Sequence, residues 1–220
     1  MIDTIFVPRG AEANAVHRAA ERVGSPVRVV TTGIGPHAAS LAVDAALAGP
    51  TIGCALVTGL CGLLSPGYVV GDALVYGEIV RDGDRSLLFL DRDVSDDVAG
   101  RIPRVQTGIR AVSVDRIVTQ ARAKVELGTR HGAHAVDMES FALAARLHEA
   151  GVAVAVARIA SDGAQDDLPD LHMALDGSGG LDTFALALAM LRRPVAGFHL
   201  ARNGTRALAA LEDTVAAILR

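Results

Sequence analysis

The chain has 220 residues, of which 50% are hydrophobic and 21% charged, and its formal net charge is −4. This composition excludes an intrinsically disordered chain, and the mild negative charge gives no reason to expect a nucleic-acid partner. A chain of this length commonly forms one domain, so we expect a single domain over residues 1–220.

Strand and helix patterns alternate along the first third of the chain. The predicted elements are strands at residues 4–7, 27–31 and 52–58 and helices at residues 13–23 and 38–48. This order predicts a parallel sheet with helices on both faces. The strand at 52–58 belongs to a 27-residue stretch without charge, residues 45–71. Prolines and glycines interrupt that stretch, so it favours a buried central strand over a membrane span, which needs about 20 continuous apolar residues.

The remaining chain adds further strands and then mostly helices. The predicted strands are 69–80, 86–91, 105–114 and 152–159, and the predicted helices are 115–129, 138–150, 181–191 and 196–219, with an acidic loop at 162–170. We therefore expect an α/β fold with one domain, in which helices flank a mixed, largely parallel central sheet and a helical tail covers about 181–220. The last helix is amphipathic, which indicates packing on the domain, with contact to a membrane surface as the alternative.

Signals for export, disulfides and metal binding are absent from the sequence pattern. The amino terminus has no basic region followed by an apolar one, so we predict no secretory signal and a cytoplasmic location. Two cysteines, Cys54 and Cys61, are too few for a disulfide framework. The seven histidines show no metal-ligand spacing. We therefore expect neither a metal nor another cofactor.

Ligands of open α/β sheets bind beyond the carboxyl ends of the parallel strands. Four short segments that contain glycine or polar residues follow predicted strands, at residues 9–12, 32–35, 58–62 and 161–163. A fifth segment, residues 136–140, starts a predicted helix. Gly33 and Gly35 form only part of a dinucleotide fingerprint, which disfavours a nicotinamide-dependent dehydrogenase.

The ordered set of these segments resembles a known superfamily. Val-Asp-Met-Glu-Ser at 136–140, followed by Ile-Ala-Ser-Asp at 159–162, is similar to paired elements of the nucleoside phosphorylase and nucleosidase superfamily, which includes the methylthioadenosine/adenosylhomocysteine nucleosidases. Thr-Gly-Ile-Gly at 32–35, the glycine-bounded turn at 59–62 and Glu12 follow the family's order. The resemblance implies that family's fold, a purine nucleoside as ligand and a homo-oligomer, because members are commonly dimers or hexamers.

A narrower resemblance concerns one branch of this superfamily. Residues 113–118, 137–140 and 191–194 resemble the hopanoid-associated phosphorylases, which are similar to enzymes that release adenine from adenosylhopane. This resemblance implies cleavage of a 5′-substituted adenosine with release of adenine. The 5′ group would then be large and lipid-like.

The family resemblance also implies a role for individual side chains. Glu139 would accept hydrogen bonds from the ribose hydroxyls, and Met138 would pack against the sugar. Asp162, oriented by Ser161 and kept protonated by burial, would donate a proton to the purine N7. Glu12 would activate water as the attacking group.

Further contacts are expected along the glycine-rich segments. The other expected substrate contacts are Gly59, Leu60, Cys61, Gly62 and Ser113. The candidate anion ligands are Arg9, Thr32, Gly33, Gly35 and Thr58, which would serve if phosphate were a second ligand.

The attacking group is predicted to be water. Val57 and Leu60 stand where the hexameric bacterial purine phosphorylases have an Arg and a Ser near phosphate, so two phosphate ligands are missing. A phosphate-dependent purine nucleoside phosphorylase is the alternative. A non-catalytic nucleoside-binding protein on the same fold is a third interpretation, and it is disfavoured because a binder needs no acid such as Asp162 at N7 beside Glu139.

Overall fold

The fold is known from a computed structural model, which describes residues 1–168 and 194–220. The first half of the chain forms β1 (Thr4–Pro8), α1 (Ala11–Val23), β2 (Arg28–Thr32), α2 (Pro36–Leu47), β3 (Cys54–Leu63), β4 (Ala73–Arg81) and β5 (Leu87–Phe89). The second half forms α3 (Arg92–Arg101), β6 (Val105–Ser113), α4 (Ala121–His131), β7 (Ala135–Asp137), α5 (Ser140–Glu149), β8 (Ala153–Asp162) and α7 (Pro194–Ile218).

The strands form one mixed sheet in which parallel pairing prevails. Its order is β2-β1-β3-β7-β6-β4-β5, and β8 pairs with both β3 and β4. The pairs β1–β2, β1–β3, β3–β8, β4–β6 and β6–β7 are parallel. The pairs β3–β7, β4–β5 and β4–β8 are antiparallel. The predicted mixed, largely parallel sheet is confirmed.

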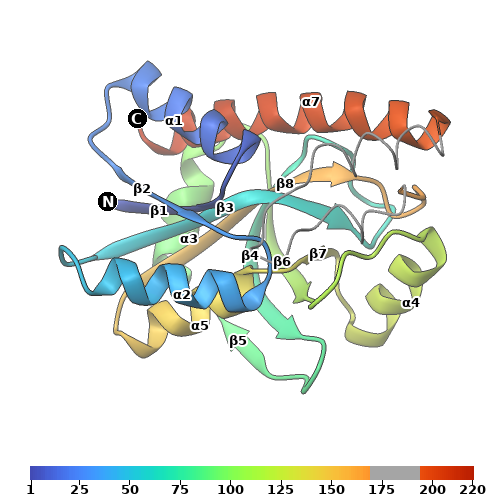
Figure 1. The fold of residues 1–220 in the computed structure, drawn as a ribbon, viewed down its shortest axis with the longest axis horizontal. Helices are drawn as coiled ribbons and strands as arrows, with labels where there is room; N and C mark the ends of the chain where they lie inside the picture. Colours follow the sequence, from blue (N-terminus) through green and yellow to red (C-terminus); the bar gives the residue numbers. More distant parts are fainter. Residues whose placement is uncertain (169–193) are drawn as a thin grey trace.

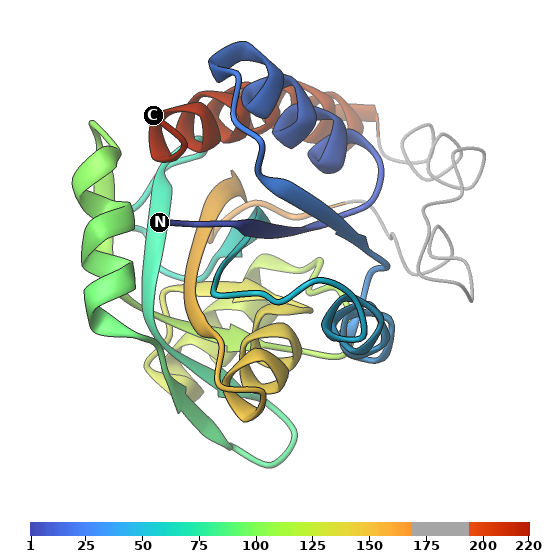
Figure 2. The same ribbon diagram turned by 90° about the vertical axis from the view of Figure 1, so that its left-hand side faces the viewer.

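Helices cover both faces of this sheet. Figures 1 and 2 show α1 and α7 side by side on one face and α2 and α5 on the other. Leu211 and Val215 of α7 are buried in the same apolar cluster as Val16 of α1, and Arg18 of α1 pairs with Glu212 of α7 at 2.7 Å. This part of the predicted tail therefore packs on the domain through its apolar face. The predicted helix at 181–191 lies outside the described residues.

The long charge-free stretch supplies the middle of the sheet. β3 lies between β1 and β8 in parallel register, and Leu56 and Val57 are fully buried. The central, buried position predicted for this strand is confirmed. Within the described residues, no helix is both long enough and apolar enough to cross a bilayer.

The predicted starts of β4 and α4 are wrong. β4 begins at Ala73 and not at Val69, because the Asp72 carboxylate accepts a hydrogen bond from the Val69 N–H at 2.9 Å and closes a turn before the strand. α4 begins at Ala121 and not at Asp115. Its first N–H donates to the Asp167 carboxylate at 2.8 Å, so the acceptor comes from a distant segment that helix-start signals do not reveal.

Two elements were missed altogether. α3 is a short helix with only Ser95 and Val98 buried, so its apolar periodicity is weak. β7 has three residues and ends at Asp137, immediately before α5. Strands this short give no period for a sequence pattern to reveal.

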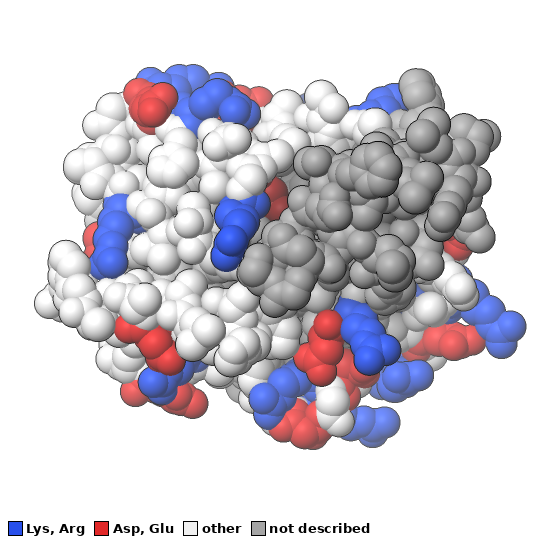
Figure 3. All heavy atoms as spheres, viewed as in Figure 1, with Lys and Arg blue, Asp and Glu red and all other residues white. Residues whose placement is uncertain are grey.

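Acidic and basic side chains lie next to one another on the described part of the face in Figure 3. The structure contains exposed ion pairs such as Arg146 with Asp44 and Arg81 with Asp84. A surface of alternating sign on this face differs from the continuous basic stripe that nucleic-acid binding favours.

Candidate active site

A fully buried arginine on β8 organises the acidic side chains at one end of the sheet. The Arg158 side chain is inaccessible, its Nη2 lies 3.6 Å from Glu139 Oε2, and its Nε lies 3.8 Å from Asp137 Oδ2. Nε also donates a hydrogen bond to Ser140 Oγ at 3.1 Å. Buried charges are stable only when they are paired, so Arg158 is the cation that permits these carboxylates to lie inside the protein. The charge of these neighbours raises the pKa of Arg158, although burial by itself would lower it.

Asp137 fixes the start of α5. Its Oδ1 accepts hydrogen bonds from the N–H groups of Glu139 at 3.2 Å and Ser140 at 3.0 Å and from Ser113 Oγ at 2.8 Å. Ser113 Oγ in turn accepts from the Phe141 N–H at 3.0 Å. The Ser113 hydroxyl, predicted to contact the substrate, is thus engaged in holding α5 within the chain.

Glu139 joins two segments that are far apart in the sequence. Its Oε1 accepts a hydrogen bond from the Gly35 N–H at 2.9 Å, and only 5% of the residue is exposed. A Cβ placed on Gly35 would lie 4.0 Å from the Met138 side chain, so Gly35 also adjoins the predicted sugar contact. Burial raises the pKa of Glu139, while the Arg158 charge opposes that shift.

Glu12 approaches the same cluster from the first turn of α1. Its Oε2 accepts a hydrogen bond from the Leu60 N–H at 2.7 Å. The residue is partly exposed, but protein atoms surround its carboxyl group. This desolvation raises the pKa of Glu12 to about 7, against the lowering effects of the Arg158 charge and the Leu60 N–H. A carboxyl group of this kind changes its charge near neutral pH.

The segment at 59–62 is not the predicted turn. It belongs to β3, with an irregular register against β8 between Cys61 and Gly62. Gly59 has φ +134°, and a Cβ there would overlap Glu12 Oε2 and lie 2.7 Å from Arg158 Nη1. The glycine therefore makes room for two side chains of the protein, where the sequence had suggested room for a ligand.

Replacing Gly59 with Ala is therefore expected to destabilise the protein by at least about 2 kcal/mol, because the new methyl group displaces Glu12 or Arg158 and the positive φ is strained. Urea unfolding measures the change. Gly83→Ala is the matched control, because a Cβ at Gly83 would meet no atom within 4 Å. Equal stability of the two variants would contradict the role given to Gly59.

Asp162 is the last residue of β8 and does not belong to the predicted loop. Its Oδ1 accepts a hydrogen bond from Ser161 Oγ at 2.7 Å, as the predicted orienting role requires. Its Oδ2 forms an ion pair with Lys124, whose side chain is fully buried. Protonation of Asp162 stays a prediction, and the pair with Lys124 is the described contact that favours the carboxylate instead. A Cβ on Gly62 would lie 3.1 Å from Asp162 Oδ2.

Several of the candidate anion ligands are engaged elsewhere. The Gly35 N–H donates to Glu139, and Thr58 Oγ1 donates to the Ala157 carbonyl at 2.8 Å. Thr32 Oγ1 is buried without a hydrogen-bond partner among the described residues. Arg9 is exposed, and its N–H donates to the Thr32 carbonyl at 2.9 Å. Anion binding at this edge of the sheet remains a prediction.

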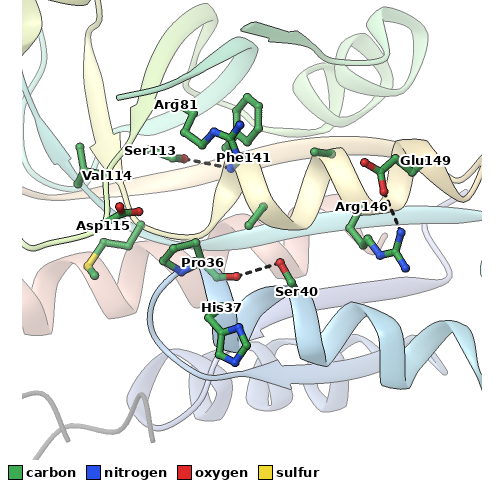
Figure 4. Close-up of a pocket in the computed structure, with 13 residues that line it drawn as sticks. Pro36, His37, Ser40, Arg81, Ser113, Val114, Asp115, Phe141, Arg146 and Glu149 are labelled. Atoms are coloured by element: carbon green, nitrogen blue, oxygen red, sulfur yellow. Dashed lines mark hydrogen bonds and ion pairs between the residues drawn. The ribbon is translucent and has the colours of Figure 1, made fainter. Parts of the chain in front are cut away.

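A cavity of about 370 Å³ lies beside Met138. Figure 4 shows that the start of α2, with Pro36 and His37, forms one wall, and α5 forms another. Arg81 stacks over the Phe141 ring, 5.0 Å from its centre, at the far end. No group of three or more His, Cys, Asp or Glu side chains among the described residues is arranged to hold a metal ion.

A sequence profile described as "Phosphorylase superfamily" matches residues 7–192, which is most of the chain. The chain belongs to the phosphorylase superfamily. The family predicted from the motifs at 136–140 and 159–162 is thereby confirmed, and so is the prediction that the protein is an enzyme of this group. No curated protein matches the sequence at a significant level.

Solved structures share the fold of this phosphorylase superfamily member at low sequence identity. The Neisseria meningitidis 5′-methylthioadenosine/S-adenosylhomocysteine nucleosidase in complex with methylthio-immucillin-A has a TM-score of 0.75 and 18% identity, over 99% of this chain and 98% of that one. The Helicobacter pylori futalosine hydrolase has a TM-score of 0.73 and 14% identity, over 98% and 95%. The Streptococcus pneumoniae MTA/SAH nucleosidase in complex with 8-aminoadenine has a TM-score of 0.67 and 17% identity, over 96% and 99%.

The superfamily motifs did not reveal every charged residue of the site. Arg158 is the only charged residue in the predicted strand 152–159, and an isolated charge in an apolar strand is a signal that could have marked it. Lys124 gave no such signal, because it lies among other charged residues of α4 and only the fold buries it.

Proposed function

We propose that the protein cleaves the N-glycosidic bond of a purine nucleoside with water and releases the base. The observation that carries this proposal is the cluster in which Glu12 and Glu139 lie around Arg158, with Asp162 farther along the same strand, β8. Gly59 adjoins Glu12 and Gly62 adjoins Asp162. Gly59 and Gly62 are three positions apart on β3, about 10 Å along a strand that rises about 3.3 Å per residue.

This arrangement suits the charges that develop when the bond breaks. The ribose acquires positive charge and the departing purine acquires negative charge. Glu139 would accept hydrogen bonds from the ribose hydroxyls and stabilise the positive sugar ring. Asp162 would deliver a proton to N7 of the purine, which makes the base a better leaving group.

Water is favoured as the attacking group because the hydrogen-bond donors around Glu12 already donate to side chains of the protein. The Leu60 N–H donates to Glu12, the Gly35 N–H donates to Glu139, and the buried guanidinium of Arg158 already faces carboxylates. A phosphate dianion would meet negative charge and few free donors here. The three fold neighbours named above are two nucleosidases and a hydrolase, which supports the same choice.

We propose adenine as the base and a 5′-substituted adenosine as the substrate. Two fold neighbours hold an immucillin-A derivative and 8-aminoadenine. The cavity beside Met138 would take the 5′ group, and its apolar wall includes Phe141 and Ala142. A lipid-like 5′ group, as in adenosylhopane, is the specific version of this proposal.

The test is incubation of the protein with methylthioadenosine, adenosine and a 5′-alkyl adenosine, each with and without phosphate, followed by chromatography of the products. Release of free base and free sugar at a rate independent of phosphate is expected. Formation of a sugar 1-phosphate only when phosphate is present would instead establish phosphorolysis. Tight binding of all three nucleosides without release of base would overturn the catalytic proposal.

Glu12 gives this reaction a predicted pH dependence. A general base acts as the carboxylate, and the pKa of Glu12 is raised to about 7. The free enzyme's kcat/KM should therefore increase as pH rises through about 7 and level off above it. Glu12→Gln should lower kcat by about 100-fold or more and remove this rise. A wild-type profile that is already flat from pH 5 upward would exclude Glu12 as the base.

A further inference from the structure

Lys124 is a fully buried lysine with no assigned role. Its Nζ donates hydrogen bonds to the carbonyl groups of Gly163 at 2.9 Å and Asp166 at 3.0 Å and forms an ion pair with Asp162 Oδ2. An ammonium group has three donors, so all of them are used. Figure 1 shows α4 at the same end of the sheet as the end of β8, where this ion pair forms.

The contacts of Lys124 are not needed to attach α4 to the segment after β8. The Asp167 carboxylate already accepts from the Ala121 N–H at 2.8 Å, and the Leu168 N–H donates to the Thr119 carbonyl at 2.7 Å. Burying a lysine is costly, and a buried ion pair often stabilises a fold no more than apolar side chains of similar volume do. The distinctive property of Lys124 is therefore the proton that it brings to Asp162.

The ammonium proton of Lys124 could supply the proton that the proposed reaction requires of Asp162. Asp162 must deliver a proton to the purine, but the ion pair with Lys124 stabilises its carboxylate form. We propose that Lys124 is a positioning residue that holds Asp162 and supplies, through Asp162, the proton that the departing purine receives. This inference rests on the proposed function.

The proton balance of the step is simple. The Nζ–H bond of Lys124 breaks and an O–H bond forms on Asp162, which leaves a neutral amine. As the bond between the sugar and the purine breaks, its electron pair goes to the base, and the O–H proton of Asp162 passes to N7. Asp162 is again a carboxylate, and Lys124 regains a proton from solvent water after the products leave.

Burial makes this transfer feasible. In water the ammonium–carboxylate form of a lysine and an aspartate is strongly preferred, because both charges are solvated. Lys124 is inaccessible and Asp162 is only 6% exposed. Desolvation penalises the ammonium–carboxylate form of the pair. The free-energy difference between this form and the neutral form, an amine with a carboxylic acid, is therefore smaller inside the protein than in water. A purine bound with its N7 edge against Asp162 would exclude water further.

Two substitutions of Lys124 distinguish the effect of its transferable proton from the effect of its positive charge. Lys124→Gln keeps hydrogen-bond donors but has no proton to release, and it is measured at about pH 8, where few solvent protons are available to the unpaired Asp162. Lys124→Arg keeps the positive charge, but a guanidinium does not give up its proton in the accessible pH range. Both variants should lower kcat for base release by about 100-fold or more, with little change in KM, as the loss of general acid catalysis requires. Arg122→Met, an exposed position on the same helix, is the matched control and should leave kcat unchanged.

A substrate that needs no proton distinguishes this role from a merely structural one. 4-Nitrophenyl riboside has a leaving group that departs as a stable anion. On this substrate Lys124→Gln and Lys124→Arg should retain kcat within about fivefold of the wild type, because no general acid is required. Equal losses on both substrates would overturn the proposal, and so would near-normal release of purine by either variant.

The proposed function and this inference fail in different ways. If the wild-type protein releases no base from any nucleoside, the proposed function fails before any variant is measured. If the wild type releases base and Lys124→Gln does so equally well, only the role of Lys124 fails. Thermal unfolding and binding of a nucleoside analogue to each variant establish that it is folded, and either folded variant suffices for the test.

Discussion

Replacing Asp162 with Asn is expected to lower kcat for purine release by at least about 100-fold, while binding of the nucleoside persists. An amide has the shape of a carboxyl group but carries no acidic proton, so it cannot assist the departure of the base. The hydrogen bond from Ser161 to the retained oxygen can persist, since the Ser161 Oγ lies 2.7 Å from Oδ1 of Asp162. The measurement is single-turnover release of base, with calorimetry for the binding constant.

The Asp162→Asn variant needs a specific control because it leaves the buried Lys124 without its counter-ion. An unpaired buried charge is costly, so part of any loss of activity could reflect lost stability. The double variant Asp162→Asn with Lys124→Met removes both charges. We expect it to regain stability but to remain inactive. Turnover within about fivefold of the wild type in the folded single variant would remove Asp162 from the role of acid.

The positions of the acidic residues could be predicted because each lies at a boundary that sequence patterns reveal. Glu12 follows the first strand, Glu139 precedes α5, and Asp162 is the last residue of β8. Parallel strands bring their carboxyl ends to one edge of a sheet, so the segments after β1, β3 and β8 lie near one another. Glu139 follows β7, which runs antiparallel to β3, and it reaches the same cluster through its contacts with Gly35 and Arg158. The ordered motifs then identified the superfamily.

The groups that set the charge of these residues could not be predicted in the same way. Lys124 lies on α4, 38 residues before its partner Asp162. The contact depends on where α4 begins, and that start is fixed by a hydrogen bond to Asp167. A local sequence pattern contains no information on a contact between residues that are this far apart in the chain. The ammonium group beside Asp162 therefore could not be predicted from the segment that contains Asp162.

The glycines of β3 lie against side chains of the protein itself. Gly59 and Gly62 are predicted substrate contacts, and the structure shows which atoms of the protein lie beside them. Glycine does permit close approach here, but the approaching groups are Glu12, Arg158 and Asp162. The shape of the site is thus set by side chains packed against β3. Sequence alone cannot decide which atoms fill the space beside a glycine.

Replacing Arg158 with Met is expected to destabilise the protein by about 3–5 kcal/mol at neutral pH, because it leaves buried carboxylates without their cation. Arg158 is fully buried and lies within 4 Å of Glu139 and Asp137. Methionine fills most of the same volume, so the loss reflects charge more than packing. Urea unfolding measures the change. Arg146→Met, which breaks exposed pairs with Asp44 and Glu149, is the control and should have little effect.

This loss of stability should depend on pH, and its sign identifies electrostatics as the cause. The pKa of Glu12 in the folded protein, about 7, lies above its ordinary value of 4.5, so ionisation of Glu12 opposes folding. Its contribution to stability is complete below pH 4.5 and is lost as pH rises through about 7. The Arg158 charge lowers the pKa of both Glu12 and Glu139, so its removal raises both further. The deficit of Arg158→Met should therefore be larger at about pH 8 than at about pH 5. A deficit that stays constant with pH would assign the effect of Arg158 to packing alone.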